Sequence, residues 1–292
     1  MSSNATPNTP DSDSREGSRF IRARVRKFIQ DLMKLDMHSK NPVDRDAAYT
    51  CSYRNIRLSV GAIGVLLPLA FIFGELATDG RIGLEGSISA YYHSSVQDMF
   101  VGALCIIGFM LVTYMSGEPK VLDFWVSLVG GIALLMVVIF PTNRSHKQFL
   151  DDPRPCGSSP RPLGCSALEQ IFHEHPVAKV HALSAIIFIL CLAIMSALFA
   201  ISELIEDGQG DPGKVPIYRP GLLWLHLACA LLIVAAGAWA LFGGLLKANI
   251  GQVTPLYLGE VVSVFAFGIS WGFAGLAATA PPRQPVQPPV TS

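Results

Sequence analysis

One stretch of the chain sets ionisable and hydroxyl side chains directly against a strongly apolar segment. Residues 87–100 read SISAYYHSSVQDMF and continue without a break into VGALCIIGFMLVTY. Ser89 and His93 are four residues apart, so on a helix they would share a face, and Asp98 follows shortly after. Histidine and carboxylate ligands with an open coordination position suit zinc, which can activate a water molecule for hydrolysis. The stretch therefore raises the hypothesis of a reactive metal site at a membrane surface.

Other ionisable residues also lie within or against apolar segments, where they are costly unless they face a protein interior or an aqueous cavity. They are Glu75, His93, Asp98, Asp123, His181, His226 and Glu260. All but Asp123 and His226 fall at the same end of the expected spans. We therefore expect a shared polar pocket at that end. In this pocket we expect His93 and His181 to be metal ligands and Asp98 and Glu260 to be catalytic acids or bases. We expect Ser89, Tyr92 and Glu75 to line the rest of it.

These residues also admit interpretations without a metal. Residues 95–98 fit a capping box with an acidic side chain in the first helical turn. Tyr91 and Tyr92 suit an interfacial aromatic belt. The histidines and acids would then form a hydrogen-bonded helix-end network, or a proton or ion pathway in which His181 and Glu260 respond to pH. A hydrolase, a transporter, and a sensor or binding protein therefore all stay open.

Membrane-spanning helices must position these side chains. Of the 292 residues, 51% are hydrophobic and 15% charged, whereas soluble domains carry about 25% charged residues. Six segments approach or exceed the roughly 20 apolar residues that cross a hydrocarbon core: 58–77, 97–115, 121–140, 177–201, 221–246 and 255–279. Backbone polar groups in lipid must be satisfied within their own segment, so the sequence predicts an all-α bundle of six transmembrane helices over 58–279. The glycine pairs at 130–131 and 243–244 would permit either helix movement or close helix packing.

The segments outside the spans are polar. Residues 1–19 are rich in Ser, Pro and Asp and contain no apolar signal-peptide core, and residues 280–292 are rich in proline. We expect both tails to be disordered or extended. Residues 20–37 separate an apolar stripe from arginines and lysines, which is typical of an amphipathic helix on anionic lipid. Residues 20–57 would thus form a basic juxtamembrane segment, and no nucleic-acid-binding fold accompanies their charge.

The placement of charge and cysteine predicts the orientation. The excess of Lys and Arg in the N-terminal segment favours an inner-membrane protein with both ends in the cytoplasm. The loop 141–176 would then be external. Cys156 and Cys165 lie in this loop among prolines and glycines, where an oxidising environment would allow a disulfide.

Several of these motifs resemble known families. The stretch SISAYYHSSVQDMFVGALCIIGF, FPTN at the end of the third span, HALSA from His181, and Glu260 with GISW at 268–271 resemble a group of uncharacterised bacterial inner-membrane proteins. This likeness covers most of residues 55–280 and implies a polytopic membrane protein without a particular activity. More distantly, Ser89-x-x-x-His93 followed by Asp98 is similar to the pattern of the alkaline ceramidase and adiponectin-receptor superfamily of membrane hydrolases. That likeness implies zinc and hydrolysis of a lipid or amphiphile, although those proteins have seven spans and a C-terminal His-x-x-x-His.

Overall fold

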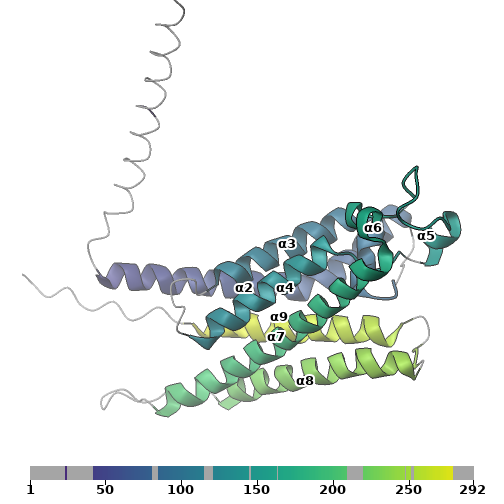
Figure 1. Cartoon of the computed structure of the whole chain (residues 1–292). Coiled ribbons are helices and arrows are strands. Elements are labelled where there is room, and N and C mark those ends of the chain that lie inside the picture. Colours follow the sequence, from purple (N-terminus) through teal and green to yellow (C-terminus); the bar gives the residue numbers. More distant parts are fainter. Residues whose placement is uncertain are drawn as a thin grey trace, which may run out of the picture. The chain divides into compact units, whose positions relative to one another are not determined.

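The described residues of the computed structural model are helical and contain no β-sheet, only the isolated bridge Ile250–Val253 (Figure 1). The elements are α2 (Pro42–Asp79), η1 (Ile88–His93), α3 (Gln97–Thr113), α4 (Leu122–Ile139), α5 (His146–Asp151), α6 (Ala167–Phe172), α7 (Glu174–Gly208), α8 (Pro220–Leu245) and α9 (Pro255–Ala277). The prediction of an all-α fold is confirmed for this part of the chain.

The structure describes residues 24, 42–80, 85–114, 121–144, 146–162, 164–208, 220–246, 248–250 and 253–278. Nearly all of them belong to one unit, residues 50–279. The tails expected at 1–19 and 280–292 lie outside the described residues. The amphipathic helix expected at 20–37 does so as well, apart from Arg24.

In the described part of the chain, five helices are long and apolar enough to cross a membrane, by their length and composition. They are Cys51–Thr78 within α2, then α4, Glu174–Leu204 within α7, α8 and α9. The apolar helix α3 is shorter, at 17 residues. The chain is thus a multi-pass membrane protein, as its composition predicted.

Local chemistry explains where several helices begin. Thr254 precedes α9, and its hydroxyl accepts a hydrogen bond from the Tyr257 amide while Pro255 occupies the first turn. A capping box of Ser166 and Glu169 opens α6. The capping box expected at residues 95–98 is wrong: Val96 caps α3 without a side-chain bond, and the Ser95 hydroxyl lies 2.7 Å from that of Thr78.

Glycines allow neighbouring helices to approach closely. A methyl group on Gly61 of α2 would lie 2.5 Å from the backbone nitrogen of Gly272 in α9. On α4, Gly131 faces the Gly108 carbonyl of α3, while Gly130 faces Cys191 of α7. The glycine pair at 130–131 therefore gives α4 a close contact with a helix on each side, which is the packing role that the sequence left open.

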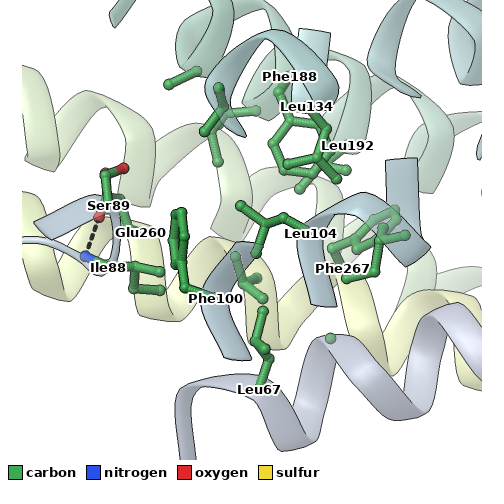
Figure 2. A pocket seen from close by; sticks show the side chains of 16 residues that line it. Leu67, Ile88, Ser89, Phe100, Leu104, Leu134, Phe188, Leu192, Glu260 and Phe267 are labelled. Carbon is green, nitrogen blue, oxygen red and sulfur yellow. Dashed lines mark hydrogen bonds between the residues drawn. The ribbon is translucent and has the colours of Figure 1, made fainter. Parts of the chain in front are cut away.

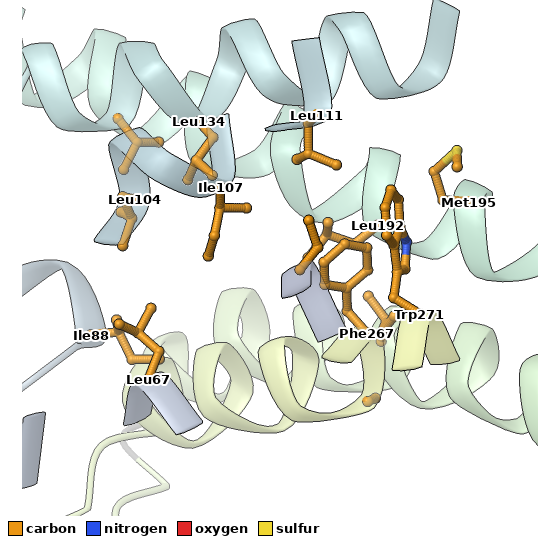
Figure 3. Close-up of a cluster of buried hydrophobic side chains, with 14 of the residues drawn as sticks. Leu67, Ile88, Leu104, Ile107, Leu111, Leu134, Leu192, Met195, Phe267 and Trp271 are labelled. Carbon is orange, nitrogen blue, oxygen red and sulfur yellow. The ribbon is translucent and has the colours of Figure 1, made fainter. Parts of the chain in front are cut away.

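A cluster of buried apolar side chains fills the centre of the bundle (Figure 3). At one end, the Trp271 ring packs on Tyr114 and Phe199, with ring centres 5.0 and 5.6 Å apart. There the guanidinium of Arg57 donates to the Tyr114 hydroxyl at 2.8 Å and lies over the Phe199 ring. Ile88 and Leu67 belong to the opposite part of the cluster (Figure 3). The chain from η1 through α3 to Tyr114 therefore runs from one end of the bundle to the other.

The Gly61 contact leads to a prediction. Replacing Gly61 by alanine should lower the free energy of unfolding by about 1–3 kcal/mol, because the methyl group collides with rigid backbone. Gly272→Ala is a matched control on the facing helix, since a methyl group there meets nothing within 4 Å. Unfolding of both variants in detergent micelles, followed by circular dichroism, would measure the difference. Equal stability of the two variants would contradict the close crossing.

Candidate functional site

The turn η1 is fastened to α9 by the carboxylate of Glu260. The amide of Ile88 donates to Glu260 Oε2 at 2.5 Å, and the Ser89 hydroxyl donates to Oε1 at the longer distance of 3.4 Å. The Ser87 hydroxyl accepts from the Ala90 amide at 3.0 Å, capping the same turn. A carboxylate is favoured at this position because the first amides of a helical turn have no partner inside it.

His181 of α7 is held by the end of α4. Its Nδ1 lies 2.7 Å from the Phe140 carbonyl and 3.1 Å from that of Val137. These carbonyls are left over where α4 stops before Pro141. Since a carbonyl only accepts, Nδ1 carries a proton, and in the neutral ring Nε2 then presents a lone pair. No other described residue bonds to Nε2, and the side chain is 5% exposed.

His181 and Glu260 line the same cavity, with a volume of about 450 Å³. Its walls come mainly from α7, α8 and α9, which pack on one another (Figure 1). The polar lining residues are Ser87, Ser89, Thr142, Asn143, His181, Glu260 and Ser263. The remaining walls are apolar. Ser263 is 1% exposed, and its hydroxyl has no partner among the described residues. We call this cavity the α7–α9 pocket.

Glu260 and Ser89 also line a smaller cavity of about 80 Å³. Figure 2 shows the Ile88–Glu260 hydrogen bond at its edge and apolar side chains such as Leu104 and Phe267 around the rest. Both cavities include Ser89 and Glu260 in their lining. They share these two residues together with Ala185 and Ile189.

The structure brings together only part of the expected site: Ser89, His181 and Glu260. His93 and Tyr92 line a different cavity of about 510 Å³, beside the loop that contains Cys165. The Nε2 of His93 bonds to the Thr142 carbonyl at 2.8 Å. Asp98 is exposed in the first turn of α3 and lines none of these three cavities, and neither does Glu75.

Tyr91 does not belong to an interfacial belt. Its side chain is fully buried, and its ring packs 5.0 Å from that of Phe71. Burial raises the pKa of Tyr91 above its ordinary value, and the hydrogen bond to Tyr257 and the charge of Glu75 act in the same direction. Glu75 itself is only 3% exposed. Both residues thus belong to the interior of the bundle.

The loop after α4 is held by an ion pair and a disulfide. Arg144 lies 2.6 Å from Glu174 at the start of α7 and donates to the Asp152 carbonyl at 3.0 Å. Cys156 and Cys165 are joined in a disulfide with their Cα atoms 5.8 Å apart. These contacts fix the loop over the end of the bundle that carries η1.

The ligand atoms of the described residues do not fit the zinc site that the distant likeness implied. Among the described residues, one group of three potential metal ligands lies close together: Cys156, Cys165 and Glu174. Its two sulfur atoms are joined in the disulfide. His93 and His181, the expected ligands, line different cavities. The arrangement instead provides hydrogen-bonding groups at one end of an apolar pocket.

Sequence reasoning missed the smaller polar residues of the α7–α9 pocket. Ser263 follows Glu260 by three residues, so both lie on one face of α9. Thr142 and Asn143 stand directly after the proline that ends α4. Two signals could have identified them. Ser263 follows a recognised acid at helical spacing, and Thr142 and Asn143 follow a proline that ends a helix.

The Glu260 contact can be tested by amide hydrogen exchange. Glu260→Ala should leave the Ile88 amide without its acceptor, which costs about 1–3 kcal/mol, so exchange at residues 87–93 should rise roughly fivefold or more. Glu260→Gln keeps an acceptor oxygen and should retain most of the protection. Exchange at the buried centre of α4 serves as the internal reference. Unchanged exchange in the alanine variant would show that Glu260 does not hold η1.

Comparison of the chain with models of protein families, with curated proteins and with solved structures found no match.

Proposed function

We propose that this protein binds an amphiphile in the α7–α9 pocket at the outer face of the inner membrane, as a binding, sensing or transport protein. The observation that carries the proposal is the polarity of the pocket. Hydrogen-bonding groups gather around His181 and Glu260, and the rest of the lining is apolar. A ligand complementary to both parts has a polar head and a hydrocarbon chain.

Access from the lipid supports this proposal. Apolar wall residues on α7 and α8 are exposed at the surface of the bundle, among them Leu190 at 54% and Val234 at 56%. In a multi-pass membrane protein such surfaces face hydrocarbon. An amphiphile can therefore enter sideways from the bilayer and keep its chain in an apolar environment throughout.

The proposed topology has six spans, with α3 as the second. Seventeen residues of helix rise about 26 Å, and spanning helices range from about 17 to 25 residues. α3 starts beside η1, near Glu260, and ends at Tyr114, near Arg57 and Trp271. It thus covers about the same depth as α9. With both chain ends in the cytoplasm, the end that carries η1 and the disulfide loop is outside.

The topology can be tested with reporter fusions. A reporter inserted after residue 150 should be on the outer side and one after residue 210 in the cytoplasm, because α7 separates them. Alkaline phosphatase and green fluorescent protein at each position give opposite readouts and control for expression. Reporters on the same side would contradict the six-span topology.

Amphiphile binding can be tested by filling the pocket. Gly237 lines it, and a methyl group there would contact Ile189, another lining residue, at 3.5 Å. Gly237→Leu should weaken binding of mono-oleoyl glycerol to the protein in lipid nanodiscs at least about tenfold, because the added side chain occupies the cavity. Native mass spectrometry of the bound amphiphile measures this.

Gly102→Leu on α3 is the matched control. Gly102 is exposed, a methyl group there meets nothing within 4 Å, and it does not line the pocket. Binding to this variant should equal that of the unmodified protein. If both leucine variants bind alike, the amphiphile does not occupy the α7–α9 pocket.

A further inference from the structure

We infer that the polar head of the bound amphiphile donates hydrogen bonds and carries no negative charge, as a hydroxyl or an amine does. This inference rests on the proposed function and adds the chemical class of the ligand. It follows from which atoms of the α7–α9 pocket are already paired and which still offer a lone pair.

The pocket offers acceptors at its polar end. Glu260 Oε2 accepts from the Ile88 amide, Oε1 lies 3.4 Å from the Ser89 hydroxyl, and each oxygen has a lone pair to offer. In the neutral ring of His181, Nε2 is also an acceptor, because Nδ1 holds the proton that bonds to the carbonyls of α4. A head with O–H or N–H groups complements these atoms.

The buried hydroxyl of Ser263 adds a group that is still to be satisfied. It lies one turn after Glu260 on α9, it is 1% exposed, and its oxygen has no partner among the described residues. A buried hydroxyl without a partner is costly, so a rotation that turns it into the pocket would let a ligand satisfy it at a site already desolvated. A hydroxyl head can both donate to and accept from this side chain.

A phosphate or carboxylate head lacks a counter-charge here. No lysine or arginine is part of the described lining of the pocket. Arg144 is close along the chain to Asn143, but its guanidinium is engaged by Glu174 and by the carbonyls of Asp152 and Arg154. An anionic head offers lone pairs and no donor to the acceptor atoms of Glu260 and His181, and no cationic side chain of the described lining compensates its charge.

The test compares amphiphiles that share an oleyl chain and differ in the head. Mono-oleoyl glycerol, oleylamine, oleic acid and oleyl phosphate are each titrated onto the full-length protein in neutral lipid nanodiscs, and dissociation constants are measured by native mass spectrometry. The glycerol or the amine head should bind at least about tenfold more tightly than the phosphate and carboxylate heads. Tightest binding of either anionic head would overturn the inference.

Glu260→Gln separates charge from hydrogen bonding, because the amide oxygen still accepts from Ile88. In this variant oleyl phosphate should gain roughly tenfold relative to mono-oleoyl glycerol. If oleylamine binds most tightly to the unmodified protein and loses this advantage in the variant, the ligand is an ammonium compound. If mono-oleoyl glycerol still binds to the variant, the ligand is a hydroxyl compound. If the variant does not fold, the order of the four heads on the unmodified protein still decides.

Failure of this inference differs from failure of the proposed function. If all four amphiphiles bind alike and Gly237→Leu weakens them all, the pocket binds amphiphiles but does not select this head. If none binds, or if Gly237→Leu leaves all of them unaffected, the proposed function itself is overturned.

Discussion

The hydrogen bond from the Ile88 amide to Glu260 organises the end of the bundle where the polar residues gather. A short turn between two apolar helices leaves its first amides without a partner inside the turn, and the carboxylate satisfies one of them at 2.5 Å. The Thr254 hydroxyl adds a contact from the start of α9 to the Gly86 carbonyl, at 2.5 Å. The turn η1 thereby becomes a wall of the α7–α9 pocket, and Ser89 comes to stand beside Glu260.

Helix packing in the bundle depends on small residues more than on polar contacts. Gly61 and Gly268 bring α2 against α9, and Gly259 lies against the Ala236 carbonyl of α8. Lipid gives no hydrophobic drive for helices to associate, so close approach and dispersion must stabilise the pairs. The close contacts of α9 with both α2 and α8 fix the position of Glu260, which lines both the smaller cavity and the α7–α9 pocket.

The sequence predicted the fold class and the depth of the polar residues along their helices. It did not predict which of these residues share one pocket. Continuous apolar runs predict helices and the approximate residues at which they end. These helix ends place Glu75, His93, His181 and Glu260 at the same end of the bundle. Depth does not determine direction, because a rotation of about 100° separates neighbouring residues on a helix. His93 therefore reaches the Thr142 carbonyl near the loop, whereas His181 reaches the carbonyls of α4 and lines the pocket. The interior position of Tyr91 likewise depends on the contact with Phe71, which no local pattern reveals.

The two hydrogen bonds of Glu260 differ in a way that suits ligand exchange. The Ile88 amide is 2.5 Å from Oε2, while the Ser89 hydroxyl is 3.4 Å from Oε1, beyond the usual range of a hydroxyl donor. In the proposed complex, a donor on the ligand can take the place of the Ser89 hydroxyl at Oε1 while Ile88 retains Oε2. The pocket would then bind its ligand without releasing η1 from α9. The Glu260 side chain thus has two roles in the proposed complex. One oxygen holds η1 against α9, and the other selects the ligand in the pocket.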